Sequence, residues 1–232
     1  KYMRRCIELA KNGLCNAAPN PMVGAVIVCD GRIIGEGYHI RCGEAHAEVN
    51  AIRSVKDESL LKRSTIYVSL EPCSHYGKTP PCADLIIEKQ IPRIVIGCQD
   101  PFSQVAGRGI QKLKDAGREV IVGVLESECR QLIRRFITFN TLHRPYITLK
   151  WAESADHFID LERTDGQPVV LSSPLTSMLV HKRRAESVAI MVGRRTALLD
   201  NPSLTVRNWY GRNPIRCLLY TSPSPRDGAT SR

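Results

Sequence analysis

The sequence has no long apolar run. None of its stretches approaches the roughly 18 consecutive apolar residues that a membrane-spanning helix needs. No charged segment followed by an apolar one opens the chain, so a signal peptide is not expected either. We therefore expect no membrane partner. An opening methionine is also missing, and since the chain begins at Lys1 within an amphipathic pattern, we expect that a few preceding residues are absent.

The number of cysteines is odd, whereas a framework of disulfides would need an even number. The chain has 9 cysteines, and the spacing of two of them is that of metal ligands, which favours a reducing cytoplasm. Isolated cysteines usually act as small buried apolar residues. We assign that role to the cysteines outside the metal-like pair: Cys6, Cys15, Cys29, Cys42, Cys98, Cys129 and Cys217.

The sequence has no block of basic residues, although its formal net charge is +10. The lysines and arginines are scattered in short pairs such as Arg4-Arg5 and Lys62-Arg63, which are typical of solvated faces. A continuous stripe that could neutralise nucleic-acid phosphates is therefore not expected. A phosphorylated small substrate and a phosphorylated nucleotide cofactor suit the same charge.

The segment from His46 to Cys82 carries the clearest chemical pattern, and it closes with the run EPCSHYGKTPPC. One imidazole and two thiols, from His46, Cys73 and Cys82, can give zinc three protein ligands and leave its fourth position for water. That is the arrangement of a catalytic zinc site. His75 lies between the two cysteines, and we assign it a loop or substrate contact because a fourth protein ligand would displace the water.

Glu48, two residues after the histidine, is the candidate proton carrier. Zinc lowers the pKa of bound water from 15.7 to roughly 7, and a nearby carboxylate can take the proton and hand it to a leaving amine. Histidine-x-glutamate followed by proline-cysteine and a second cysteine is the signature of the zinc-dependent nucleobase deaminases. The sequence resembles that superfamily at His46, Glu48, Pro72, Cys73 and Cys82.

The spacing of the two cysteines departs from the common pattern. Most of these deaminases place two residues between them, whereas the run from Ser74 to Pro81 intervenes here. This longer loop, with Pro-Asn-Pro-Met-Val-Gly at 19–24 and Gln-Asp-Pro at 99–101, is similar to the bifunctional riboflavin-biosynthesis deaminase/reductase family. The resemblance covers nearly the whole chain up to about Leu219.

That resemblance implies an α/β protein with a cytidine-deaminase-like α/β/α layered sheet, followed by a partial dihydrofolate-reductase-like α/β domain. Two domains also agree with the length of 232 residues. The boundary is expected at His143-Arg144-Pro145, because the residue before proline is pushed out of the helical region. We therefore assign residues 1–143 to a zinc-dependent pyrimidine deaminase domain, 144–219 to the N-terminal part of an NADPH-dependent reductase domain, and 220–232 to an unstructured, unrelated tail.

The resemblance also implies residue roles. Zn²⁺ would be held by His46, Cys73 and Cys82, with Glu48 as the catalytic residue. The substrate-binding positions are Asn20, His39, Lys78, Arg184, Leu204 and Arg207. The NADPH-binding positions are Ala152, Val170, Thr196 and Asp200. Without the resemblance, Lys78 is an ordinary loop lysine, Asn20 equally well shapes its own turn, and the two arginines are surface charges.

The activity implied is hydrolytic deamination of a diaminopyrimidine ribosylamino phosphate in riboflavin biosynthesis, followed in the complete enzyme by reduction of the ribosyl group with NADPH. The family continues past this chain with further strands, helices and a glycine-rich loop. We therefore expect the deaminase half to survive and the reductase half to be impaired. The sequence does not determine whether the protein is a homo-oligomer.

Two other functions stay open. A nucleic-acid base deaminase would share the zinc chemistry, but it predicts the shorter cysteine spacing and no second domain. A structural zinc module in a binding protein would need a fourth good ligand and gives no reason for Glu48.

Alternating helices and strands are predicted along the chain. The first domain should contain strands at 23–29, 32–38, 65–70, 93–98 and 120–124, the first two joined by a tight turn at Asp30-Gly31 and forming one edge of the sheet. Helices are expected from Tyr2 to near Gly13, at the segment that carries His46 and Glu48, and at 84–89, 109–116 and 127–139. The second domain should hold a strand at 146–150, a helix that Ser173-Pro174 starts, and strands at 188–193 and 214–220.

One residue departs from the family within the second domain. His157 stands where the family usually has glycine, and glycine at such a position often serves a turn with positive φ. The local backbone near the expected cofactor site is therefore expected to depart from that of the family.

Overall fold

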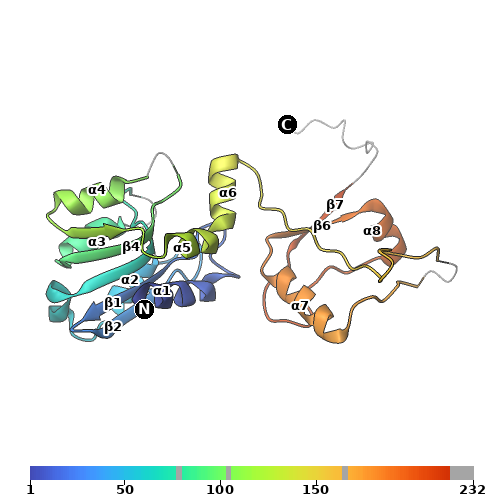
Figure 1. The fold of residues 1–232 in the computed structure, drawn as a ribbon, viewed down its shortest axis with the longest axis horizontal. Coiled ribbons are helices and arrows are strands. Elements are labelled where there is room, and N and C mark those ends of the chain that lie inside the picture. The colour runs from blue at the N-terminus through green and yellow to red at the C-terminus, as the bar shows by residue number, and fades with distance from the viewer. Residues whose placement is uncertain (77–79, 103–105, 164–166, 220–232) are drawn as a thin grey trace. The chain divides into compact units, whose positions relative to one another are not determined.

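The computed structural model describes residues 1–76, 80–102, 106–163 and 167–219 (Figure 1). The chain divides into two compact units, Lys1–Ile147 and Thr148–Arg232. The predicted tail at 220–232 lies outside the described residues. No helix in the described part is long and apolar enough to cross a membrane.

The first unit is built on a five-stranded sheet with the strand order β2-β1-β3-β4-β5. β1 pairs antiparallel with β2 and β3, whereas β3, β4 and β5 run parallel. The strand bounds are β1 Gly24–Cys29, β2 Arg32–Tyr38, β3 Thr65–Leu70, β4 Arg93–Cys98 and β5 Glu119–Val122. β2, β3 and β4 coincide with the predicted ranges, and the other two differ by one or two residues at an end.

The hairpin between β1 and β2 forms as the turn residues predict. Asp30 has φ 49° and Gly31 has φ 75°, and two successive positive φ values are the mark of a two-residue hairpin turn that matches the twist of its strands. β2 is the edge strand, so the prediction that this pair forms one edge of the sheet is confirmed.

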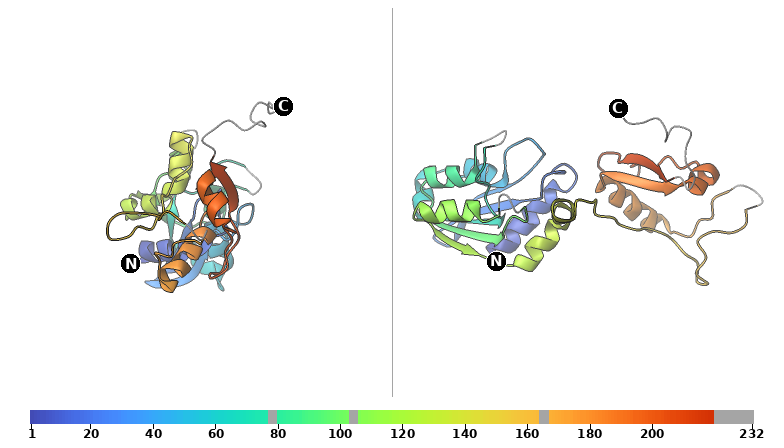
Figure 2. Two further views of the ribbon diagram at one scale, coloured as in Figure 1. Left: turned by 90° about the vertical axis from the view of Figure 1, so that its right-hand side faces the viewer. Right: turned by 90° about the horizontal axis from the view of Figure 1, so that it is seen from above.

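Helices cover both faces of this sheet (Figures 1 and 2). One face packs against α2 Ala47–Arg53, α3 Cys82–Glu88 and α4 Arg108–Asp115; the other packs against α1 Tyr2–Ala10 and α5 Glu126–Leu132. The strands are accordingly apolar on both sides: Ala25 and Ile27 of β1 belong to the first core, whereas Val26 and Val28 belong to the second. The predicted α/β/α layering is confirmed.

Two short 3₁₀ helices also belong to the first unit, Lys11–Gly13 after α1 and Glu58–Arg63 before β3. The helix predicted at 127–139 is wrong as a single element. It is divided into α5 and α6 Arg134–Leu142 at Ile133, whose backbone leaves the helical region with φ −100° and ψ 17°. Ile133 is buried in the sheet core, and no glycine or proline signals this break in the sequence.

The second unit has a smaller regular part. Its helix α7 Pro174–Ala185 starts as predicted, because the Ser173 hydroxyl oxygen accepts a hydrogen bond from the Thr176 N–H at 3.2 Å. β6 Ala189–Gly193 and β7 Ile215–Leu219 form a parallel pair, and α8 Arg194–Asp200 follows β6. His157 adopts φ 68°, so the histidine occupies the left-handed conformation in which glycine is expected.

The strand predicted at 146–150 is wrong. These residues form no regular element, and the described sheet of this unit contains β6 and β7 alone. A β-branched run becomes a strand only where a neighbouring strand takes up its backbone hydrogen bonds.

A close approach between β2 and α2 fixes the position of that helix. A Cβ atom on Gly37 would lie 2.3 Å from the backbone nitrogen of Ala51 and 2.6 Å from the carbonyl oxygen of Ala47. Both contacts are with backbone, so no side-chain rotation could relieve them. Glycine at 37 is therefore required for α2 to rest against the sheet.

We expect Gly37→Ala to destabilise the first unit by about 1–3 kcal/mol, because overpacking forces backbone shifts. Denaturant unfolding would measure the change. Gly193→Ala is the matched control, since a Cβ there meets nothing within 4 Å. Equal stability of the two variants would contradict the packing argument.

Candidate metal centre

The N-terminus of α2 positions His46 and Glu48. His46 is the residue that precedes the helix and has an extended backbone, with φ −72° and ψ 167°. Glu48 lies in the first turn and is only 3% exposed. Since the histidine stands outside the helical spiral, both side chains can reach one centre although they are two residues apart. The helix predicted at this segment is confirmed, and the pair lies at its N-terminus.

The two cysteines come from the end of β3 and the start of α3. Cys73 follows β3, and Cys82 is the first residue of α3. The Cys82 N–H donates to the Cys73 sulfur at 3.3 Å, and the Ala83 N–H donates to the Cys73 carbonyl oxygen at 3.1 Å. Free N–H groups at a helix N-terminus stabilise negative charge, so this position favours a thiolate.

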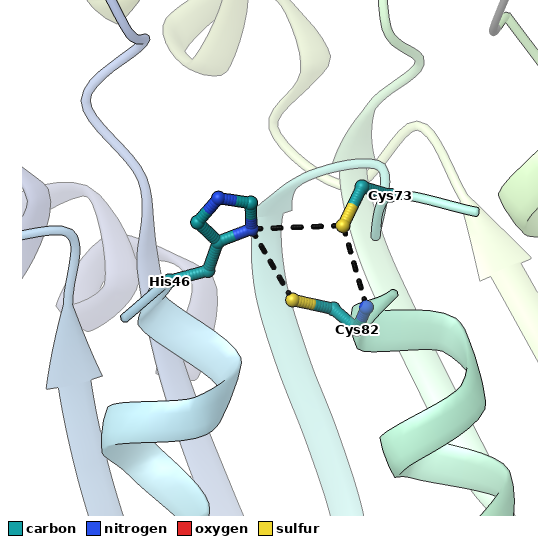
Figure 3. A group of neighbouring side chains, drawn as sticks. All are labelled: His46, Cys73 and Cys82. Atoms are coloured by element: carbon teal, nitrogen blue, oxygen red, sulfur yellow. Dashed lines mark hydrogen bonds between the residues drawn. The ribbon is translucent and has the colours of Figure 1, made fainter. Parts of the chain in front are cut away.

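The three predicted metal ligands converge (Figure 3). The His46 Nδ1 atom lies 3.6 Å from the Cys73 sulfur and 3.4 Å from the Cys82 sulfur, and the three donor atoms all lie within 4.8 Å of one another. Tetrahedral zinc with Zn–N near 2.0 Å and Zn–S near 2.3 Å would separate a nitrogen and a sulfur ligand by about 3.5 Å. The donor set and its spacing therefore fit zinc.

The protonation of the two thiols is linked. The hydrogen bond from Cys82 lowers the pKa of Cys73 to about 4, and the same bond together with burial raises the pKa of Cys82. One thiol of the pair thus acts as donor to the other. A divalent cation favours the deprotonated form of both, so metal binding would release a proton.

Burial raises the pKa of Glu48 to about 7, and the nearby charge of Cys73 adds to the shift. A carboxyl group with a pKa near neutral can both take and give a proton, which is what a general acid and base requires. Its neighbours are the ligand residues themselves, since the interactions that shift this pKa come from Cys73, His46 and Cys82.

A cavity of about 380 Å³ opens on this centre. It is lined by polar residues from several loops and by a few apolar ones: Asn20, Pro21, Val23, His39, Cys42, Gly43, Glu44, His46, Glu48, Leu70, Glu71, Cys73, His75, Asp100 and Phe136. Two of the substrate contacts predicted from the family, Asn20 and His39, thus face the same space as Glu48. Lys78, the third in this unit, lies outside the described residues.

His39 and Asn20 form a hydrogen-bonded pair at the cavity wall. The His39 Nδ1 faces the Ala45 carbonyl oxygen at 3.1 Å and must donate to it, which leaves Nε2 to accept from the Asn20 amide nitrogen at 3.1 Å. Burial also lowers the pKa of His39, in keeping with a neutral ring. The Asn20 amide group is thereby oriented with its nitrogen toward His39. A phosphate or ribose contact of His39 stays a prediction.

Asp100 and Phe136 are among the cavity residues that received no role from the sequence. Asp100 follows the end of β4, and sites of parallel sheets gather at the carboxyl ends of strands, so this signal could have found it. Phe136 lies in α6, whose direction depends on the break at Ile133. No local sequence pattern could have placed it.

In the second unit, α7 and the segment 204–207 bring two of the predicted substrate residues together. The Arg184 guanidinium donates to the Thr205 carbonyl oxygen at 3.1 Å, and the Arg207 N–H donates to the His181 ring at 2.9 Å. Burial, with the charge of Arg207 nearby, lowers the pKa of Arg184. The Arg184 Nε is buried and has no hydrogen-bond partner in the described part of the chain. Leu204, the third predicted residue, is buried beside them.

The predicted cofactor positions are spread over this unit. Asp200 ends α8 and forms an ion pair with Arg163. Val170 and Thr196 are exposed, and Ala152 is half-buried. Their role toward NADPH stays a prediction.

Two protein families match the chain, one on each unit. The cytidine and deoxycytidylate deaminase zinc-binding region matches residues 1–98. The RibD C-terminal domain matches residues 145–229.

Individual relatives match across both units. The chain is 44% identical over 219 residues to the riboflavin biosynthesis protein RibD of Aquifex aeolicus, which covers 94% of this chain and 60% of that protein. It is 45% identical over 206 residues to RibD of Escherichia coli, covering 89% of this chain and 55% of that one.

Solved structures agree with these matches. Acinetobacter baumannii RibD has a TM-score of 0.86 at 39% identity, over 94% of this chain and 62% of that one. A diaminohydroxyphosphoribosylaminopyrimidine deaminase/5-amino-6-(5-phosphoribosylamino)uracil reductase from Thermotoga maritima has a TM-score of 0.85 at 47% identity, over 94% of this chain and 61% of that one. The chain thus spans between about half and two thirds of the length of these relatives.

We expect Cys73→Ser to lose bound zinc, because the variant replaces a thiolate ligand by a hydroxyl that stays protonated at neutral pH. Metal analysis after dialysis against a weak chelator would measure it. Cys42→Ser is the matched control, since Cys42 lines the same cavity but lies outside the ligand group. Equal zinc content in both variants would refute the ligand assignment.

Proposed function

Because this chain belongs to the RibD family of riboflavin biosynthesis proteins, we propose that its first unit is a zinc-dependent pyrimidine deaminase in that pathway. Its substrate would be a diaminopyrimidine ribosylamino phosphate, a small phosphorylated molecule that suits the net charge of +10. The reaction replaces a ring amino group by oxygen and releases ammonia. The proposal includes a cytoplasmic location and no membrane or nucleic-acid partner.

One observation carries the proposal: three metal-ligating side chains converge, and two of them, His46 and Cys73, line one cavity together with the buried carboxylate of Glu48. His46, Cys73 and Cys82 would hold the zinc, and Glu48 stands beside them in the wall of the cavity. Zinc held there would act as a Lewis acid and lower the pKa of a water toward neutrality. Glu48 is no member of the ligand group, so its carboxylate is free for proton transfer.

Glu48 would carry the protons of the reaction. A water oxygen forms a bond to the ring carbon that bears the amino group, and Glu48 accepts the proton that the water loses. Glu48 gives this proton to the adjacent ring nitrogen, whose double bond to the attacked carbon has opened. Glu48 then carries the proton of the new hydroxyl to the amino nitrogen, the C–N bond breaks, and ammonia leaves as the hydroxyl becomes a carbonyl. Substrate and water are thereby converted into the deaminated pyrimidine and ammonia with no other reactant. A pKa of about 7 for Glu48 suits both directions of transfer.

The pyrimidine ring would be recognised by other residues that line the same cavity. The Asn20 amide nitrogen is engaged by His39, so its carbonyl oxygen is the atom left for a ring N–H or amino group. Phe136 and Leu70 supply apolar surface to the same cavity. Lys78 and His39 are our candidates for the phosphate or ribose part of the substrate.

A nucleic-acid base deaminase would use the same zinc chemistry, and it is the less favoured function. The long segment between the cysteines and the match of residues 145–229 to the RibD C-terminal domain both speak against it. A structural zinc module is disfavoured by Glu48, since a closed site has no use for a buried carboxylate at its edge.

The second unit would belong to the NADPH-dependent reductase that reduces the ribosyl group. Arg184 and Arg207 are our candidates for the substrate phosphate, with Leu204 beside them. Ala152, Val170, Thr196 and Asp200 are our candidates for NADPH contacts. The buried Arg184 Nε has no hydrogen-bond partner among the residues that the structure describes, which supports an anion site, because a planar guanidinium is suited to bind phosphate oxygens.

The direct test of the deaminase is product analysis by mass spectrometry. Zinc-loaded protein is incubated with the diaminopyrimidine ribosylamino phosphate and NADPH, and we expect the deaminated product together with ammonia. Unchanged substrate, from folded protein that holds zinc, would rule out this substrate.

We expect Glu48→Gln to lower the deamination rate by about 10²–10⁴-fold, because the amide cannot carry the proton. Its zinc content should equal that of the wild-type chain. Glu58→Gln is the control, since Glu58 pairs with Lys89 at the surface. A Glu48→Gln variant with normal activity would mean that another group transfers the proton.

We expect Arg184→Met to weaken binding of ribose 5-phosphate by roughly 10–100-fold, because hydrogen bonds to charged groups contribute about 1.5–3 kcal/mol. Titration calorimetry would measure the change. Arg183→Met is the matched control: it is the neighbouring arginine on α7, and it pairs with Glu186 instead. The same affinity in both variants would place the phosphate elsewhere.

A further inference from the structure

The carboxylate of Glu71 is buried at the junction of three elements of the first unit, and nothing in the chemistry proposed above uses it. It is only 6% exposed. It lies at the end of β3, two residues before the metal ligand Cys73. Burying a carboxylate costs folding free energy unless its oxygens accept hydrogen bonds. The partners of Glu71 therefore indicate its structural role.

Among the described residues, the hydrogen bonds that the Glu71 side chain accepts all come from backbone N–H groups between Asp100 and Ile110. Oε2 accepts from Asp100 at 3.1 Å and from Gly107 at 3.0 Å. Oε1 accepts from Gly109 at 2.9 Å and from Ile110 at 3.2 Å. Each oxygen thus has two donors, and no salt bridge is seen at this carboxylate among the described residues.

Three of these donors belong to the start of α4. Gly107 precedes the helix and has no side chain to cap it, and Gly109 and Ile110 lie in its first turn. Serine, threonine, aspartate or asparagine usually accepts such N–H groups from the residue just before a helix. Here a glutamate from another strand takes that place, so the cap also ties α4 to the end of β3.

The fourth donor ties the carboxylate to the cavity. Asp100 follows β4 and lines the cavity beside Cys73 and His75. The backbone of Glu71 is fixed to the same strand end, because its N–H donates to the Cys98 carbonyl oxygen at 2.9 Å. One residue therefore sets both the end of β3 and the path of the chain after β4.

The start of α4 is packed tightly against the backbone that follows β3. A Cβ atom on Gly109 would lie 2.0 Å from the carbonyl oxygen of Pro72, the residue between Glu71 and Cys73. The start of α4 thus touches the peptide that leads directly into the metal ligand. A shift of α4 would move Cys73, since the contact is between backbone atoms.

We propose that Glu71 is a positioning residue whose carboxylate, by binding four backbone N–H groups, holds Cys73 in place for the metal and Asp100 in place at the cavity wall. This inference rests on the proposed zinc-dependent function. The same hydrogen bonds would arise if Glu71 served only to cap α4. The two roles differ in what they predict for metal affinity.

Glu71→Gln is the principal test, made in the full chain. An amide keeps the size of the side chain, but its nitrogen cannot accept, so two of the four N–H groups lose their partner. Groups that orient metal ligands from outside the first coordination sphere typically account for 10–100-fold in metal affinity or activity. We expect zinc affinity, measured by competition with a chromogenic chelator, to fall by roughly 10–100-fold. Excess zinc should restore most of the deaminase activity lost at limiting zinc.

The control removes a helix cap of the same kind away from the cavity. The Asp57 carboxylate accepts from the Ser59 N–H at 3.0 Å and caps the short helix Glu58–Arg63. Asp57→Ala removes this cap, so it should lower thermal stability with unchanged zinc affinity. If Glu71→Gln behaves in the same way as Asp57→Ala, then Glu71 is a cap only and the proposal is wrong.

A second variant covers the case in which Glu71→Gln does not fold. Glu71→Asp keeps the charge but is one methylene shorter, so it cannot reach all four N–H groups, and we expect a smaller loss of zinc affinity in the same direction. Wild-type zinc affinity in folded Glu71→Asp would overturn the proposal. Failure of the proposed function would look different, because the wild-type chain itself would then bind no zinc or deaminate nothing.

Discussion

The candidate site depends on the meeting of two helix N-termini at the carboxyl end of β3. α2 delivers His46 and Glu48, α3 delivers Cys82, and the strand itself delivers Cys73. In a layered α/β unit the helices that follow or precede parallel strands begin at the same edge of the sheet, so their free N–H groups point to one region. That region favours thiolates and, through them, a cation. The ligand set is thus a consequence of topology as much as of residue type.

The position of α2 on the sheet depends on small residues at the contact between β2 and α2. Glycine at 37 and at 35 lets the backbone of α2 rest on the sheet, with Ala47 and Ala51 at the contact. A helix held at backbone contact has little freedom to slide, because interiors are packed without voids. The direction of His46 is therefore set by residues that have no chemistry of their own.

The sequence allowed the parts of this unit that depend on local pattern to be predicted. The apolar strands, the Asp30-Gly31 turn and the ligand triad all follow from composition, spacing or family motif. The break at Ile133 could not be predicted, since it results from burial of that side chain against the sheet rather than from a helix-breaking residue. The place of Phe136 depends on that break. The strand predicted at 146–150, where the two units meet in the sequence, failed for a related reason: a strand needs a neighbouring strand, and one segment does not carry that information.

The site holds two buried glutamates whose surroundings assign them opposite tasks. Glu71 has two N–H donors on each oxygen, so its carboxylate is a fixed acceptor with no lone pair directed at a substrate. Glu48 is buried among the metal ligands, and burial raises its pKa to about 7, so it can exchange a proton near neutral pH. Both residues have the same side chain and nearly the same exposure, and the sequence distinguishes them only through the histidine two residues before Glu48. The two glutamates are therefore distinguished by how many hydrogen bonds their carboxylates accept. Burial does not distinguish them, because both are buried.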